Sequence, residues 1–247
     1  TLRTMSLRID IWSDIACPWC LIGKRRFDRA IQQLPFADQI EVEYHSYLLD
    51  PDLPTRYDGT EAQYLAERKG LPAEQVSQML AQVTEVAAGE GLAYDFDHLV
   101  VASSRRAHRL LQAARRVAPD HSAGGLVPRL KGALLEAHFE QGVDIGDDDA
   151  LVRIATIAGL DEQAARTALT DESLDEAVQL SVSTASSLGI QGVPFYVIDD
   201  RYGISGAQPT EAFVQALTQV WQEKQATPAP LLLPMADAGE ACGPEGC

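Results

Sequence analysis

Two cysteines separated by two residues, Cys17 and Cys20, lie between a predicted strand and a predicted helix. Residues 7–12 alternate apolar and polar side chains, as a half-buried strand does. Apolar residues then recur at helical spacing over residues 21–34, and a proline ends that pattern. A second alternating segment, residues 40–47, predicts another strand. The chain therefore opens with a β–α–β unit that carries the cysteine pair after its first strand.

The position of Cys17 at the start of a helix predicts a reactive thiol. Pro18 then occupies the first helical position, where a missing N–H costs nothing. The unpaired N–H groups of the first turn and the positive end of the helix dipole stabilise a thiolate there. We therefore expect Cys17 to have a lowered pKa and to attack, and Cys20, one turn further on, to resolve. Pro18 removes a donor and Trp19 adds apolar surface, so the potential can lie anywhere from about −270 to −120 mV.

Zinc is the main alternative use of such a pair. The chain has a second close pair, Cys242 and Cys247, so four thiolates are available to one ion. Zinc pairs normally sit on compact knuckles, whereas Cys17 and Cys20 follow a strand and precede a long helix. The five histidines show no ligand spacing with one another. We therefore expect no bound metal.

The rest of the chain reads as helix, then hairpin, then helix. Residues 60–188 are rich in helix formers and are too long for a loop, so we expect an inserted helical domain. Two short strands and a last helix follow, and beyond Gln225 the composition shifts to Pro, Ala and Gly. The expected parts are a discontinuous α/β domain (1–59 and 189–225), the all-α insertion (60–188) and a flexible tail (226–247).

The sequence motifs resemble those of a known family. Residues 10–20 read Asp-Ile-Trp-Ser-Asp-Ile-Ala-Cys-Pro-Trp-Cys, Gly23-Lys24 follows, and residues 189–195 read Gly-Ile-Gln-Gly-Val-Pro-Phe. With the helical insertion, this pattern resembles the DsbA family of thiol–disulfide oxidoreductases, most closely its FrnE-like branch, over about residues 8–225. The resemblance implies an α/β, thioredoxin-like fold with a large all-α insertion after the second strand.

The resemblance also implies that Val193–Pro194 is a cis peptide facing Cys17. The sequence alone leaves this open, because a Gly-x-Pro entering a strand is tolerated at an edge or a bulge without being cis. Cys17, Cys20 and Pro194 would then be the catalytic residues, with Pro18, Trp19 and Val193 completing the motif.

The activity that this implies is thiol–disulfide exchange on protein or peptide substrates, in the oxidase, reductase or isomerase direction. No bound cofactor is expected, and glutathione or thioredoxin-type proteins are candidate exchange partners. Two other interpretations stay open. One is a glutathione-dependent isomerase or kappa-class transferase of the same fold, which has serine where Cys17 stands. The other is a redox-inactive peptide-binding or chaperone module, which the intact cysteine pair argues against.

Charge and hydropathy limit the classes of partner that we expect for this chain. The formal net charge is −16, which disfavours nucleic-acid binding. No run approaches the roughly 18 apolar residues that span a membrane. Residues 1–8 lack the apolar stretch of a signal peptide, so we expect a cytoplasmic protein without membrane contact.

Two further features bear on the redox chemistry. Gly and Pro between Cys242 and Cys247 favour a tight turn that would bring the sulfurs together. We expect a second disulfide there, with incidental thiols or a metal site as alternatives. The pair could exchange with Cys17 and Cys20 as a second redox pair, or be isolated from them and stay oxidised. Asp14, three residues before Cys17, would either tune the pKa of Cys17 or cap the loop.

Overall fold

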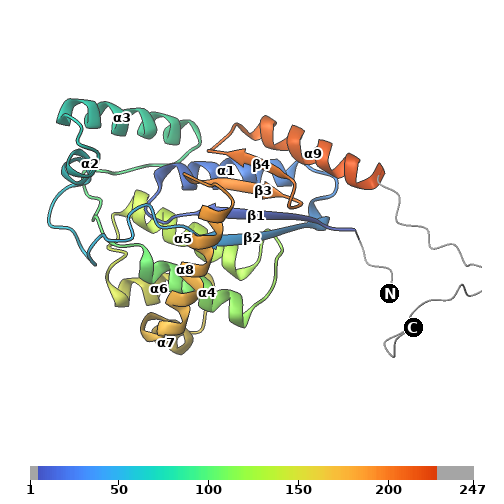
Figure 1. Cartoon of the computed structure of the whole chain (residues 1–247). Coiled ribbons are helices and arrows are strands. Elements are labelled where there is room, and N and C mark those ends of the chain that lie inside the picture. The colour runs from blue at the N-terminus through green and yellow to red at the C-terminus, as the bar shows by residue number, and fades with distance from the viewer. Residues whose placement is uncertain (1–4, 227–247) are drawn as a thin grey trace, which may run out of the picture.

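A four-stranded mixed sheet lies at the centre of the computed structural model, which describes residues 5–226 (Figure 1). The strand order is β2-β1-β3-β4. β1 (Leu7–Ser13) pairs in parallel with β2 (Ile40–Ser46) and antiparallel with β3 (Phe195–Ile198). β4 (Tyr202–Ser205) closes the predicted hairpin with β3. The two predicted opening strands are confirmed.

The two faces of the sheet differ because side chains alternate along each strand. Ile9 and Ile11 of β1 face α1 (Pro18–Gln32) and α9 (Thr210–Ala226), with which they form an apolar core. Their neighbour Asp10 is also buried but contributes to a polar network on the opposite face. One face of the sheet is therefore apolar, and the other carries charged side chains.

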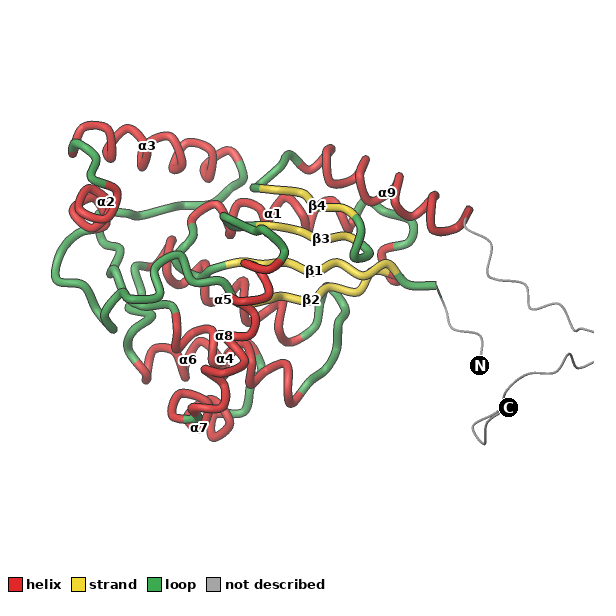
Figure 2. Tube along the Cα trace, viewed as in Figure 1, coloured by secondary structure: helices red, strands yellow, loops and turns green. Residues whose placement is uncertain are grey.

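Helices fill the chain between β2 and β3, as the composition predicted. Figure 2 shows these helices in red beside and below the yellow strands. In chain order they are α2 (Glu61–Lys69), α3 (Ala73–Gly89), α4 (Arg105–Val117), α5 (Leu126–Gln141), α6 (Asp148–Ala158), α7 (Glu162–Thr170) and α8 (Glu172–Ser187). A short 3-10 helix (Ala37–Gln39) precedes β2.

Local capping explains several of these helix boundaries. Thr60 forms a capping box with Gln63 at the start of α2, and the Asp147 carboxylate accepts the Ala150 N–H at the start of α6. Gly70 and Gly142 end α2 and α5 with positive φ, which glycine adopts without steric cost.

The apolar core does not divide where the sequence suggested a domain boundary. One cluster joins Cys17, Cys20 and Leu21 to residues of α3–α8 such as Leu134 and Phe139. The division into two domains stays a prediction. The cysteine pair lies where α1 meets the inserted helices, so side chains of the insertion can reach it.

Some expectations concern residues that the structure does not describe. Cys242 and Cys247 lie in 227–247, outside the described residues, and α9 continues to Ala226, the first residue of the expected tail. Within residues 5–226, no helix combines the length and the apolar character needed to span a membrane.

Candidate active site

Cys17 occupies the N-cap of α1, as the sequence predicted. Its backbone is extended, its side chain makes no capping hydrogen bond, and Pro18 follows in the first turn. The Cys20 N–H donates to the Cys17 carbonyl at 3.0 Å, so the two residues share one turn of backbone. Both cysteines are free thiols and are buried, with 4% and 2% of their surfaces exposed. This is the arrangement of a dithiol that can close to a disulfide.

The loop before β3 lies against the first thiol. The Cys17 Sγ lies 3.4 Å from the carbonyl oxygen of Val193, within hydrogen-bond reach across 176 positions of sequence. The Val193–Pro194 peptide is cis, as the family resemblance implied. Three of the predicted site residues therefore lie together: Cys17, Val193 and Pro194.

Gly23 allows this loop to approach α1. A Cβ added at Gly23 would lie 2.7 Å from the Tyr196 hydroxyl and 2.9 Å from Cγ of Pro194. Real Cβ atoms essentially never make such contacts. A residue larger than glycine would therefore push the Pro194 loop away from α1.

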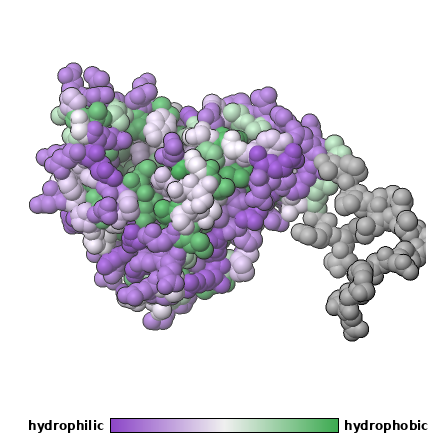
Figure 3. All heavy atoms as spheres, in the orientation of Figure 1, coloured by the Kyte–Doolittle hydropathy of each residue, from purple (hydrophilic) through white to green (hydrophobic). Residues whose placement is uncertain are grey.

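The surroundings of the pair combine apolar surface with backbone contacts. Trp19 is 38% exposed, and Leu49, whose N–H donates to Asp14, is 44% exposed. Tyr94 donates its hydroxyl to the Pro18 carbonyl at 2.5 Å and so holds the first turn of α1. Figure 3 shows a green area at the middle of the visible face, between polar surfaces above and below it. At the cysteine pair itself, the exposed side chains of Trp19 and Leu49 are apolar surface that a partner chain can contact.

The pKa order of the two thiols is the reverse of the sequence prediction. The hydrogen bond with Cys20, burial, and the negative charges of Cys20 and Asp14 raise the pKa of Cys17. Burial opposes the ionisation of Cys20, but the hydrogen bond from Cys17, the Lys131 ammonium and the Ser13 hydroxyl together lower its pKa. The sequence argument rested on the helix N-terminus and left a contribution from Asp14 open, and it missed Lys131 and the hydrogen bond between the thiols.

Asp14 has both of the roles that the sequence left open. Its carboxylate accepts the Leu49 N–H at 2.8 Å and the Ala16 N–H at 3.3 Å, so it caps the loop before α1. It also pairs with His108 of α4 at 3.1 Å, with both side chains almost fully buried. Burial would raise the pKa of Asp14, but these partners outweigh it and the pKa is lowered. The carboxylate therefore stays charged and repels a thiolate on Cys17.

Lys131 and His108 are the site residues that sequence reasoning missed. Lys131 of α5 is 1% exposed, and its Nζ donates to the Ser13 carbonyl at 3.1 Å. A lysine inside an apolar helical segment was the only signal, and it did not indicate which partner the ammonium meets. Below, the dithiol cluster means the following residues: Asp14, Cys17, Cys20, His108 and Lys131.

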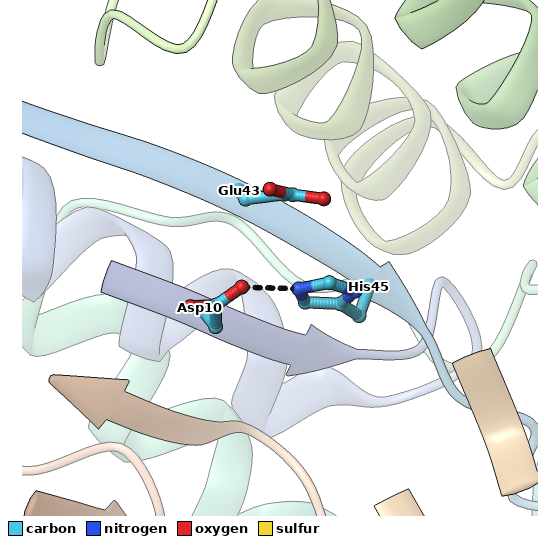
Figure 4. A group of neighbouring side chains, drawn as sticks. All are labelled: Asp10, Glu43 and His45. Carbon is cyan, nitrogen blue, oxygen red and sulfur yellow. Dashed lines mark hydrogen bonds and ion pairs between the residues drawn. The ribbon is translucent and has the colours of Figure 1, made fainter. Parts of the chain in front are cut away.

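A second polar group lies on the charged face of the sheet. Figure 4 shows Asp10 of β1 hydrogen-bonded to His45 of β2, with Glu43 beside them. The three side chains could each offer a metal one ligand, since their ligand atoms lie within 4.8 Å of one another. The histidine spacing did not reveal this group, because strand pairing assembles it.

The residues around this group fit an ion-pair network better than a metal site. Arg8 pairs with Asp10 at 2.8 Å and with Glu43 at 3.3 Å, and Arg115 also pairs with Glu43. Two guanidinium groups thus already balance the two carboxylates, and they would repel a cation. Below, the strand cluster means the following residues: Arg8, Asp10, Glu43, His45 and Arg115.

The fold and the site together define a class: thioredoxin-fold proteins with an active-site cysteine pair, a cis-proline loop and a helical insertion. Residues 8–218 match the DSBA-like thioredoxin domain family. The chain belongs to this family of thiol–disulfide oxidoreductases.

Individual relatives agree with this placement. A probable DsbA oxidoreductase from Streptomyces coelicolor is 39% identical, with a TM-score of 0.80 and 98% of each chain covered. An uncharacterized protein of Bacillus subtilis, YwbO, is 24% identical over 221 residues, which are 89% of this chain and 100% of that protein. The cytosolic disulfide reductase DsbM from Pseudomonas aeruginosa, solved with GSH, shares the fold at 19% identity and a TM-score of 0.62, with 87% of this chain and 99% of that chain covered.

Proposed function

We propose that the protein catalyses thiol–disulfide exchange on protein or peptide substrates through Cys17 and Cys20. The observation that carries the proposal is the free dithiol at the start of α1, with the Cys17 sulfur 3.4 Å from the Val193 carbonyl beside cis Pro194. This places Cys17 at the loop and Cys20 deeper in the helix. The finer placement in the FrnE-like branch stays a prediction.

The reaction runs in two exchanges. The Cys17 thiolate attacks a substrate disulfide, so a mixed disulfide forms and the first substrate thiolate leaves. The Cys20 thiolate then attacks the Cys17 sulfur, which closes the Cys17–Cys20 disulfide and releases the second substrate thiolate. The substrate is reduced by two electrons and the protein is oxidised by two; the reverse sequence oxidises a dithiol substrate.

The hydrogen bond between the thiols supports the first exchange despite the high pKa of Cys17. When one of the two thiols ionises, Cys20 is the preferred holder of the charge, because the interaction between them raises the pKa of Cys17 and lowers that of Cys20. When Cys17 attacks, its proton moves to Cys20, so no proton has to reach bulk water.

The Val193–Pro194 backbone is proposed to receive the substrate. Thiol-redox folds of this kind pair an extended peptide with such a segment, because main-chain hydrogen bonds give affinity without sequence selection. The exposed apolar side chains of Trp19 and Leu49 would add contacts to the peptide.

Glutathione is the proposed small-thiol partner and the cytoplasm the proposed compartment. The shared fold with a cytosolic disulfide reductase solved with GSH supports both. The same fold serves other chemistry, and glutathione-dependent isomerisation is the alternative. Retention of both cysteines favours disulfide exchange, since an isomerase of this fold would need no resolving thiol.

The test is turnover of a protein disulfide with glutathione as reductant. Wild type should turn over, Cys17→Ser should not, and Cys20→Ser should accumulate a mixed disulfide. The double variant Cys242→Ser/Cys247→Ser is the matched control, because it removes two thiols elsewhere in the chain. Full turnover by Cys17→Ser would refute the proposal, and unchanged turnover by the double variant would remove the predicted tail pair from the mechanism.

A further inference from the structure

Lys131 is a buried cation for which the two exchanges above give no role. It comes from α5 of the helical insertion and is 1% exposed. Among residues 5–226, the Ser13 carbonyl is the one hydrogen-bond acceptor of its ammonium, at 3.1 Å. An ammonium has three donors, and burial of a charge is costly unless it is paired. The charge of a lysine buried in this position is therefore expected to act on the groups around it.

The charges that face Lys131 come from three other elements. The loop after β1 contributes Asp14, α1 contributes Cys17, Cys20 and Lys24, and α4 contributes His108. Lys24 is bound to Asp28 at 2.6 Å, so that ammonium already has a counter-ion. Asp14 is held by His108 and two backbone N–H groups. Cys20 is the facing group whose other partners, the Cys17 thiol and the Ser13 hydroxyl, carry no positive charge.

Ser13 ties Lys131 to Cys20. The Ser13 carbonyl holds the ammonium, while the Ser13 hydroxyl favours the Cys20 thiolate. Ser13 is the last residue of β1 and is itself buried, so it fixes both groups to the rigid end of a central strand.

We propose that Lys131 is a positioning residue of the exchange reaction, which places positive charge from the helical insertion beside Cys20 and so promotes the resolving step. The proposal rests on the function proposed above. In the mixed disulfide, Cys17 carries no thiol and cannot share a proton, so ionisation of Cys20 depends on the neighbouring charges. The Cys20 proton leaves to water, the thiolate attacks Cys17, and the substrate thiolate departs, while Lys131 keeps its own proton.

A nitrobenzoate disulfide with a coloured thiolate product separates the two exchanges. With Cys242→Ser/Cys247→Ser as background, the first release of colour reports attack by Cys17 and the second reports resolution by Cys20. Lys131→Met removes the charge and keeps a similar volume, and Lys131→Gln is a second variant. The rate of the second phase is measured from about pH 6 to about pH 9.5 in each protein.

The expected result is a shifted pH profile. The second phase should be about tenfold slower in Lys131→Met near pH 6.5, because a shift of one pKa unit in Cys20 changes the thiolate fraction about tenfold. The difference should shrink to about twofold near pH 9.5, where Cys20 is ionised in both proteins. Burial also lowers the pKa of Lys131, to about 8, so wild type loses the extra charge over the same range. Lys24→Met should change the second phase less than about twofold.

Other outcomes overturn the inference. A second phase slowed equally at every pH would show that Lys131 matters only for structure. An unchanged profile in Lys131→Met would show that its charge does not act on Cys20. A wild-type inflection at or above the free-thiol value of about 8.5 would contradict the proposal without any variant. Loss of the first phase in wild type would refute the proposed function itself, and the inference with it.

Discussion

The dithiol cluster and the strand cluster are both buried polar groups at β1, but their charges are balanced differently. In the strand cluster, two guanidinium groups meet two carboxylates, and His45 stacks on Trp12 at a centroid distance of 4.3 Å. Arginine stays protonated at all relevant pH values, so this network keeps its charge. In the dithiol cluster, the cation is a lysine with a pKa lowered to about 8, and two of the three acids are thiols, with the Asp14 carboxyl as the third.

This difference separates a structural network from a reactive one. Groups that titrate near neutral pH can move protons during a reaction, whereas fixed ion pairs cannot. The inserted helices contribute to both clusters, with Lys131 and His108 at the dithiol and Arg115 at the strands. The insertion therefore supplies Lys131 and His108 to the dithiol cluster as well as covering the sheet.

The largest expected effect comes from removing one charged or reactive group from each cluster. Cys17→Ser should lower exchange activity by more than about 1,000-fold, because the attacking thiolate is gone. Asp10→Asn should leave activity within about twofold and lower the free energy of unfolding by about 2 kcal/mol, since a buried ion pair is broken. Turnover and chemical denaturation measure the two. Strong loss of activity in a folded Asp10→Asn would mean that the clusters are not separate.

A pair of tryptophans tests the comparison next. Trp12 is 3% exposed, and its Nε1 donates to the Ser181 carbonyl at 3.1 Å, whereas Trp19 is 38% exposed. Trp12→Ala should lower the free energy of unfolding by about 3–5 kcal/mol. Trp19→Ala should change it by less than about 1 kcal/mol and instead raise the KM for a peptide substrate about threefold to tenfold. Equal KM values for Trp19→Ala and wild type would remove Trp19 from the substrate surface.

The buried Lys131 and the half-buried Arg115 should have opposite effects on stability. The pKa of Lys131 falls from 10.5 to about 8 on burial, so Lys131→Met should raise the free energy of unfolding at pH 7 by up to about 3.5 kcal/mol, at about 1.4 kcal/mol per pKa unit. Arg115→Met should lower it by about 1 kcal/mol, because Glu43 then loses one of its two guanidinium partners within residues 5–226 and keeps Arg8, at 3.3 Å.

The free energy of unfolding should change with pH in a direction that the pKa of Lys131 determines. Between about pH 8 and 10.5 the unfolded chain binds more protons at this lysine than the folded chain does, so wild-type stability gains a rising contribution as pH increases. Below pH 8 the full cost of burying the charge is present. Denaturation curves across this range should show the rise in wild type and in Arg115→Met, and lose it in Lys131→Met. If Lys131→Met kept the rise in the free energy of unfolding, another titrating group would be its cause.

The smallest expected effect is at Gly23, the position in α1 where the missing side chain lets the Pro194 loop pack closely. Gly23→Ala should lower the free energy of unfolding by about 1–2 kcal/mol and slow exchange about tenfold, because the new methyl group displaces Tyr196 or Pro194. Gly89→Ala is the matched control. Gly89 ends α3 with open space around its Cα, so alanine there should stabilise the protein by about 0.5–1 kcal/mol. Slower exchange by Gly89→Ala as well would refute the explanation that the effect of Gly23→Ala comes from its contact with Tyr196 or Pro194.

Much of the fold could be predicted because its signals are local. Alternation gave β1 and β2, helix-forming composition gave the region of α2–α8, and the motif placed Cys17 at a helix start. The cis Val193–Pro194 peptide needed the family resemblance, since its contact with Cys17 spans 176 positions. Local signals thus predicted elements, while the pairing of distant loops depended on recognising the family.

The charges of the site could not be predicted, because packing of distant helices places them. Lys131 meets Ser13 across 118 positions and His108 meets Asp14 across 94. The strand cluster depends on the register that sets Asp10 opposite Glu43. For the same reason a lowered pKa was predicted for Cys17, whereas the folded site lowers the pKa of Cys20. A helix N-terminus is visible in sequence, but a buried carboxylate and ammonium around it are not.

Peptide mapping of a trapped mixed disulfide tests the central claim most directly. Cys20→Ser is reacted with a peptide disulfide at neutral pH, quenched with acid, digested and analysed by mass spectrometry. Attack by Cys17 and resolution by Cys20 predict one stable adduct, on Cys17, and in the converse variant Cys17→Ser almost no adduct on Cys20. An adduct that forms on Cys20 as readily as on Cys17, or no adduct on Cys17, would contradict the account.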